Sequence, residues 1–178
     1  NKFDEIFNKV TSTVITQIEN LTNIASEFST FAKMPTIKLV EVELISIIHE
    51  TVDLFIEENC KVEVSTEINE IKVKSDKEQF QRMMINLIRN SIQAEASQII
   101  VSVKLLLDAV EISVRDDGHG ISKEILSRIF EENYTTKKEG MGLGLSLARR
   151  FLDVTGGIIL VNETSSSGTE IIIKIPNN

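Results

Sequence analysis

A run of isoleucines near the carboxyl terminus, with three of them two positions apart, is the feature that most constrains the fold. In the segment "TEIIIKIP", residues 169–176, the side chains that share one face are Thr169, Ile171, Ile173 and Ile175. A period of two is typical of a strand that buries one face of a sheet. The segment "GIILVNET" before it also reads as a strand, and "SSSG" joins the two. The chain is therefore expected to build a sheet with one buried face.

Strand and helix patterns alternate from Pro35 onward. "IKLVEVEL" reads as a short strand, and a helix is expected to begin near Glu43. "KVEVSTEI" and "IKVKS" are predicted to form a hairpin at Asn69, and "IIVSVKLLL" and "VEISVRD" a second one around Asp108-Ala109. The pattern predicts an α+β two-layer sandwich, with a mixed or mostly antiparallel sheet and helices on one face.

A long amphipathic helix is predicted next. Ser75 or Asp76 is expected to cap it, and it runs to about Glu95. Its apolar side carries Phe80, Met83, Met84, Leu87 and Ala94, and its polar side carries Arg82, Asn86, Arg89, Asn90 and Gln93. Asn is a mediocre helix former, but its amide can bind a hard cation or a phosphate oxygen. A solvated polar face explains the pattern equally well.

The first 31 residues carry a different pattern. Apolar residues recur here at alternating spacings of three and four, and the pattern is broken only at Gln17. They are Phe3, Phe7, Val10, Val14, Leu21, Ile24, Phe28 and Phe31. This is a heptad seam on one long helix that ends before Pro35. Such a seam needs a partner helix, so residues 1–34 are predicted to be part of a helical hairpin or bundle, and residues 35–178 the second domain. An amphipathic helix folded back on its own domain is the alternative.

Composition limits the partners. The net charge of −8 argues against nucleic acid or an anionic membrane surface as the main partner. No apolar run approaches the roughly 18 residues that span a bilayer, and no signal-peptide pattern opens the chain, so we expect this fragment to be soluble. The single cysteine, Cys60, fits a reducing compartment.

Two glycine-containing motifs suggest a ligand. In "RDDGHGI", Asp116 ends a strand, and Gly118 and Gly120 would let the backbone approach a bulky ligand such as a purine, although an ordinary turn explains the motif nearly as well. In "EGMGLGLSLARR", alternating glycines precede a helix that is expected to begin near Leu143 and to stop at Gly156-Gly157. Free N–H groups there could hold a phosphate.

The segment between the two motifs reads as a lid. It runs from about Ser122 to Gly140 and contains "RIFEENYTTKKEG". Lys137 could meet a terminal phosphate, or both lysines of the segment are simply solvated. The alternating glycines match neither the dinucleotide-binding nor the P-loop fingerprint, so neither of those sites follows.

The order of these motifs resembles the N, G1, F and G2 boxes of the GHKL ATP-binding superfamily, closing with Gly168-Thr169. The match is closest to the catalytic and ATP-binding domain of sensor histidine kinases. "NLIRNSIQA", "IFEENYTTK" and "GMGLGLSLARR" look most like the nitrogen-regulation (NtrB/NtrY-type) branch. The resemblance covers Pro35 to Pro176 and implies the Bergerat ATP-binding fold. The heptad helix resembles the second helix of a dimerisation and phosphoacceptor hairpin.

The resemblance also implies roles for individual residues. Asp116 would accept from the adenine amine, and Asn90 would coordinate Mg²⁺ between the phosphates. Lys137 and the amides around Gly142 to Leu145 would hold the β- and γ-phosphates, and Gln93 stands where many relatives have Lys or another polar residue. The implied ATP-binding residues are Asn86, Asn90, Gln93, Asp116, Gly118, Gly120, Ile121, Tyr134, Thr135, Thr136, Lys137, Gly140, Gly142, Leu143, Gly144, Leu145 and Thr169.

The implied activity is that of an ATP-dependent protein histidine kinase of a two-component signalling system. Hydrolysing relatives place a Glu at the position of Asn86, and an amide cannot activate water, so transfer is favoured over hydrolysis. His49 is read as a surface or partly buried histidine of a helix, and His119 as an exposed one. The phosphoacceptor is expected to lie outside this fragment, which would then not autophosphorylate alone. No catalytic residue is assigned.

The resemblance implies ATP, a phosphoacceptor helix and the receiver domain of a response regulator as partners, and a homodimeric full-length protein. This portion is expected to be cytoplasmic, while the full-length protein could be membrane-anchored. Two alternatives stay open: a serine kinase of the anti-sigma-factor type, and a non-catalytic nucleotide-binding or dimerisation module.

Overall fold

The computed structural model describes residues 6–15, 17–18, 22, 36–132, 134–135 and 142–177. The chain divides into two compact units, and each is treated separately below. The larger comprises Ile37–Glu132 and Gly144–Asn178, and the smaller comprises Asn1–Thr36 and Asn133–Leu143. Among the described residues, no helix has both the length and the apolar character needed to cross a membrane.

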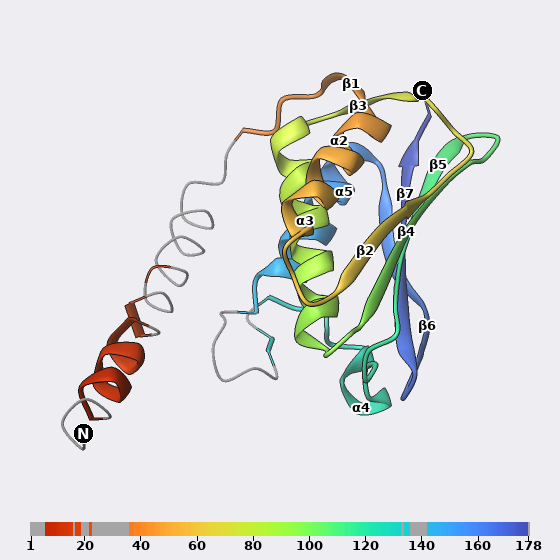
Figure 1. The fold of residues 1–178 in the computed structure, drawn as a ribbon. Helices are drawn as coiled ribbons and strands as arrows, with labels where there is room; N and C mark the ends of the chain where they lie inside the picture. Colours follow the sequence, from red (N-terminus) through yellow and green to blue (C-terminus); the bar gives the residue numbers. More distant parts are fainter. Residues whose placement is uncertain are drawn as a thin grey trace. The chain divides into compact units, whose positions relative to one another are not determined.

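A five-stranded sheet forms one layer of the larger unit (Figure 1). Its order is β2 (Lys61–Ser65), β4 (Gln98–Leu105), β5 (Ala109–Asp116), β7 (Gly168–Pro176) and β6 (Ile158–Ser165). β2 runs parallel to β4, and the remaining neighbours are antiparallel. The prediction of a mixed, mostly antiparallel sheet is therefore confirmed.

Three helices cover one face of this sheet in Figure 1: α2 (Leu44–Val52), α3 (Lys77–Gln93) and α5 (Gly144–Thr155). The short elements are η1 (Asp53–Phe55), α4 (Lys123–Leu126) and a two-stranded sheet of β1 (Val40–Glu43) with β3 (Lys72–Ser75). The core lies between the layers. Its fully buried side chains include Phe80, Met84, Leu87, Ile99, Ile112, Leu152 and Ile173. Each buried side chain of this size stabilises the fold by about 1.5–3 kcal/mol relative to exposure.

The predicted hairpin between "KVEVSTEI" and "IKVKS" is wrong. β2 pairs in parallel with β4, and β3 pairs with β1 in the separate two-stranded sheet. The reason is the apolar matching: Val73 pairs with Val42, while Val64 pairs with the buried Val101. The predicted hairpins β4–β5 and β6–β7 are both present.

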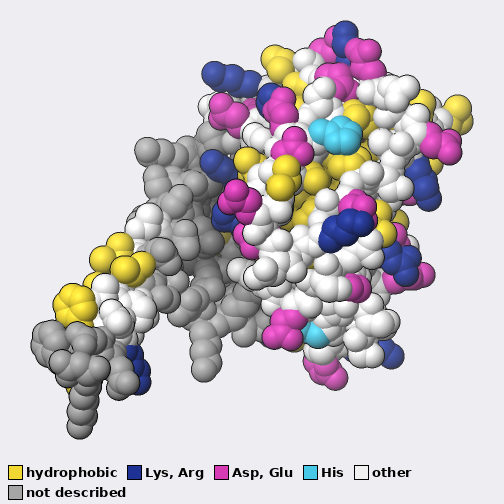
Figure 2. Space-filling model, in the orientation of Figure 1, with side chains coloured by type: hydrophobic (Ala, Val, Ile, Leu, Met, Phe, Trp, Pro, Cys, Tyr) yellow, Lys and Arg dark blue, Asp and Glu magenta, His cyan; other side chains and the backbone are white. Residues whose placement is uncertain are grey.

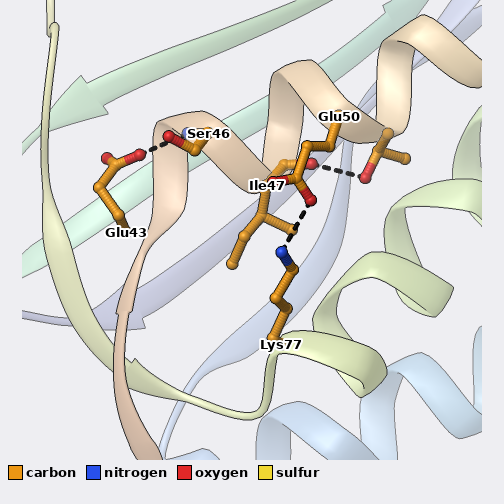
Figure 3. Close-up of polar contacts among 6 residues, drawn as sticks. Glu43, Ser46, Ile47, Glu50 and Lys77 are labelled. Carbon is orange, nitrogen blue, oxygen red and sulfur yellow. Dashed lines mark hydrogen bonds and ion pairs between the residues drawn. The ribbon is translucent and has the colours of Figure 1, made fainter.

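Side chains at the start of α2 and α3 fix where these helices begin. Of the two predicted caps for α3, Asp76 is the one used, and it accepts from the Gln79 N–H at 3.1 Å. Glu43 caps α2, and Figure 3 shows it beside Ser46. Figure 3 also shows the ion pair at 2.8 Å between Glu50 of α2 and Lys77, the first residue of α3. Both helices therefore have defined starting points, and α2 packs against α3.

The Glu43 carboxylate has an unusually low pKa. Partial burial raises the pKa, but hydrogen bonds with Ser46 and with the N–H groups of Ile71 and Ile45 lower it by more. The net result is a fall from 4.5 to about 2. Its Oε1 accepts from both Ile45 and Ile71 at 3.0 Å. The carboxylate therefore ties α2 to the segment that leads into β3.

In the smaller unit, residues 6–15 form a helix. Its apolar side chains are exposed, and Figure 2 shows hydrophobic atoms on its surface. The exposed fractions of Phe7, Val10 and Val14 are 59%, 55% and 50%. The other predicted heptad residues, Phe3, Leu21, Ile24, Phe28 and Phe31, lie outside the described residues. The boundary between domains 1–34 and 35–178 stays a prediction.

Candidate functional site

Helix α3 presents two asparagines on its polar side. Asn86 and Asn90 are partly buried, whereas Arg82, Arg89 and Gln93 are exposed. The opposite side of the helix is anchored by Phe80, Met84 and Leu87, which are fully buried in the core. Because these residues fix the rotation of α3, the two amides lie at the boundary between core and solvent.

The Asn86 side chain lies directly against the start of α5. A Cβ added to Gly144 would be 2.1 Å from Asn86 Oδ1, so a larger residue there would force Asn86 to move. The Asn86 Nδ2 atom is buried and has no hydrogen-bond partner among the described residues. A buried amide donor without a partner costs free energy, and an anionic oxygen would satisfy it. The first N–H groups of a helix favour the same kind of ligand.

Asp116 is the second focus of the site, and three donors hold its carboxylate. The Ser91 hydroxyl donates to Oδ2 at 2.7 Å, and the N–H groups of Gly118 and Thr169 donate to Oδ1 at 3.0 and 3.1 Å. A carboxylate has about four lone-pair positions, so roughly one remains for a ligand donor. Asp116 is partly buried at the end of β5.

Ser91 was missed by the sequence analysis. It is 5% exposed and follows Asn90 on α3, yet its partner Asp116 lies 25 residues further along the chain. A serine after the second asparagine was a signal that the site could extend along α3, but its partner could not be named. The contact joins α3 directly to the end of β5.

Two glycines allow the backbone around the turn after Asp116 to pack closely. Gly120 has a φ of +74°, and a Cβ on it would lie 1.8 Å from the backbone carbonyl oxygen of Ser165. Gly168 has a φ of +132°, and a Cβ on it would lie 1.9 Å from the backbone carbonyl oxygen of Asp116. Both positions therefore need glycine, for conformation and for space. The turn lies tightly against the β6–β7 hairpin.

A pocket of about 490 Å³ opens beside Asp116 and Thr169. Thr164 lines it and connects the walls, since its hydroxyl accepts from the Ile121 N–H at 2.8 Å and shares a hydrogen bond with the Thr169 hydroxyl at 3.1 Å. Lys123 and Leu126 contribute from the α4 side. The predicted residues Asp116 and Thr169 thus line one cavity, and Ile121 is bonded to its wall.

The structure places Asn86 against Gly144, and it groups Asp116, Gly118, Gly120, Ile121 and Thr169 around the end of β5 and the β6–β7 hairpin. Asn90 and Gln93 lie on α3 with Asn86, and Leu145 lies on α5 with Gly144. Tyr134, Thr135, Gly142 and Leu143 belong to the smaller unit. Thr136, Lys137 and Gly140 lie outside the described residues. The roles assigned to all these residues stay predictions.

Asp117 is an exposed carboxylate at the turn, and its side chain accepts hydrogen bonds from Ser97 and Gln98. His49 on α2 and His119 are both exposed, in agreement with their interpretation as surface histidines.

Comparison with known proteins gives the family. The model of the histidine kinase-, DNA gyrase B- and HSP90-like ATPases matches residues 75–178. An NtrY-like sensor histidine kinase of Rickettsia felis is 27% identical over 97% of this chain and 30% of its own length. Sporulation kinase E of Bacillus subtilis is 29% identical over 96% of this chain and 23% of its own length. The chain therefore spans less than a third of these relatives.

Solved structures agree. The catalytic domain of histidine kinase ThkA superposes with a TM-score of 0.72 at 30% identity, over 79% of this chain and 96% of that one. ThkA in complex with the response regulator TrrA gives a TM-score of 0.75 at 27% identity, over 92% of this chain and 49% of that one. These findings confirm the resemblance to the GHKL superfamily and to histidine kinase catalytic domains. The chain belongs to the family of histidine kinase-, DNA gyrase B- and HSP90-like ATPases.

Proposed function

We propose that this chain is the ATP-binding part of a two-component sensor histidine kinase, which transfers the γ-phosphate of ATP to a histidine outside the chain. The observation that carries the proposal is the pairing of a fixed carboxylate with a buried amide donor. Asp116 is held by three donors at one end of the site, and Asn86 Nδ2, beside the first residue of α5, has no acceptor in the part of the chain that the structure describes. The relatives that are named sensor histidine kinases favour this function over a serine kinase.

Asp116 would bind the adenine. The exocyclic amine of adenine is a donor, and the remaining acceptor position of the carboxylate suits it. Guanine carries a carbonyl at the same position of the ring, so two acceptors would face each other. Because Ser91, Gly118 and Thr169 hold the carboxylate, it cannot rotate away without losing hydrogen bonds. We therefore expect a preference for ATP over GTP.

Asn86, Asn90 and the start of α5 would hold the phosphates. Among the described residues, no group of three or more His, Cys, Asp or Glu side chains is placed to hold a metal ion. A Mg²⁺ ion would then be held by the Asn90 amide oxygen together with the phosphates, an arrangement typical of this ion. The ion supplies charge stabilisation during phosphoryl transfer. Lys137 is proposed to contact the terminal phosphate.

The acceptor is proposed to be a histidine of a helical hairpin, in the full-length chain or its dimer mate. Asn86 lacks a carboxylate that could activate water, which favours transfer over hydrolysis. The exposed apolar side chains of helix 6–15 support a bundle with a second helix, and with it a homodimeric full-length protein. The ThkA complex supports a response regulator as the next acceptor, and this portion is proposed to act in the cytoplasm.

Transfer of labelled γ-phosphate to a supplied His-bearing helical hairpin tests the proposal. We expect a product that is labile in acid, as phosphohistidine is. An acid-stable product would support the serine kinase. ATP binding without transfer would support a non-catalytic module. The Asn90→Ala variant is the matched control, because it should abolish transfer while leaving the core intact.

A further inference from the structure

We propose that Asp117 is a positioning residue, whose carboxylate fastens the adenine-binding turn to the connection between α3 and β4. The inference rests on the proposed function, because the turn it fixes carries Asp116. Asp117 does not line the pocket beside Asp116. Its effect would therefore pass through the backbone and not through contact with the nucleotide.

Three hydrogen bonds carry the proposal. Oδ1 of Asp117 accepts from the N–H groups of Ser97 and Gln98 at 2.7 and 2.9 Å, and Oδ2 accepts from the Ser97 hydroxyl at 2.5 Å. Ile99 and Asp116 form the last paired residues of β4 and β5 at this end. The carboxylate thus continues the connection between the two strands beyond the end of their ladder.

The turn and the end of α3 are also in close backbone contact. The His119 N–H donates to the Ala94 carbonyl at 3.0 Å. A Cβ added to Gly118 would lie 2.6 Å from the same oxygen, so nothing larger than glycine fits between them. Glu95 has a φ of 62°, a left-handed conformation that is uncommon without glycine. This sharp turn places Ser97 where Asp117 can bind it.

The two neighbouring carboxylates therefore hold one turn at two different places. Asp116 contacts Ser91 within α3, and Asp117 contacts Ser97 just after α3. Hydrogen bonds from the Ser97 hydroxyl and the N–H groups of Gln98 and Ser97 lower the pKa of Asp117, so the carboxylate stays charged at neutral pH. Together these contacts set the position of Asp116 relative to Asn86 and Asn90, because those two residues lie on α3 with Ser91.

The test compares ATP and GTP binding to four proteins by calorimetry. Asp117→Ala removes all three hydrogen bonds, and we expect it to weaken ATP binding roughly tenfold and to reduce the preference for ATP over GTP. Asp117→Asn should restore both, because its amide oxygen can accept from the two N–H groups and its NH₂ can donate to Ser97 Oγ. Asp153→Ala, an exposed carboxylate on α5, controls for the loss of one charge.

A merely structural role would lower the melting temperature of Asp117→Ala without changing the ratio of ATP to GTP affinity in the folded protein. That result would overturn the inference, as would unchanged ATP binding. If Asp117→Ala does not fold, Ser97→Ala keeps the two N–H contacts and should lower ATP affinity about threefold, with a smaller change in the ratio; an unchanged ratio there would also overturn it. If the unaltered chain does not bind ATP, the proposed function itself fails, and the inference fails with it.

Discussion

Replacing Glu43 by Gln should lower the stability of the larger unit in a pH-dependent way. The Gln carbonyl can still accept from the N–H groups of Ile45 and Ile71, which now bond to Glu43 Oε1. Its NH₂ group would face the Ser46 N–H, which now donates to Oε2. One hydrogen bond to a charged acceptor is therefore lost, and a donor faces a donor.

The pKa of Glu43 gives the size of the effect. A fall in the pKa from 4.5 to about 2 corresponds to about 3.4 kcal/mol in the free energy of unfolding, at 1.36 kcal/mol for each unit of pKa. Glu43 keeps some contact with solvent, which screens the interaction, so we expect a loss of about 1–2 kcal/mol at pH 7. Because the folded-state pKa is depressed, the stabilisation is complete above about pH 4.5 and disappears as the pH falls toward 2.

Urea unfolding followed by circular dichroism at pH 7, 4.5 and 3 measures this difference. Glu57→Gln is the matched control, because Glu57 is an exposed acid after η1 whose loss should change stability little. A Glu43→Gln variant as stable as the unaltered chain at pH 7 would refute the reasoning. An equal difference at pH 7 and pH 3 would show that the charge of Glu43 is not the cause.

Three further substitutions test other contacts. Ser91→Ala removes the hydroxyl that orients Asp116 and should weaken ATP binding about 3- to 10-fold by calorimetry, whereas unchanged affinity would argue against that role. Gly168→Ala would place a Cβ 1.9 Å from the backbone carbonyl oxygen of Asp116, at a φ of +132°. Thermal unfolding should show that the free energy of unfolding falls by about 2–4 kcal/mol, and a fall below about 1 kcal/mol would contradict this. Glu50→Gln breaks an ion pair whose side chains are half exposed, so urea unfolding should show a change under about 0.5 kcal/mol, and a larger one would mean that the pair is more than a surface contact.

Local sequence patterns predicted those parts of the fold in which neighbours in sequence are neighbours in space. The strand pairs β4–β5 and β6–β7 are such cases, and alternation of apolar residues was enough to place them. The pairing of β2 was mispredicted because its partner β4 lies beyond α3. A parallel pair needs a crossover connection, which a nearby turn signal such as Asn69-Glu70 does not reveal.

The site was predictable where a motif carries the chemistry and unpredictable where distant side chains meet. Asp116 was singled out from its place at the end of a strand before two glycines. The Ser91 hydroxyl on Asp116 and the Ser97 contacts of Asp117 join residues about 20 or more positions apart, and neither motif contains both partners. The need for glycine at position 144 likewise becomes clear only from the fold, in which the Asn86 side chain lies against it.

The central claim is that the Asp116 carboxylate binds the amine of adenine, and comparing ATP and GTP binding to Asp116→Asn tests it most directly. Asn keeps an oxygen for the N–H groups of Gly118 and Thr169, and its NH₂ can donate to Ser91 Oγ, so the fold should be retained. The ligand would then meet a donor in place of an acceptor. We predict that the unaltered chain prefers ATP and that Asp116→Asn loses at least about tenfold in ATP affinity, with a shift of preference toward GTP. Equal binding of ATP by both proteins, with the same ratio to GTP, would contradict the claim.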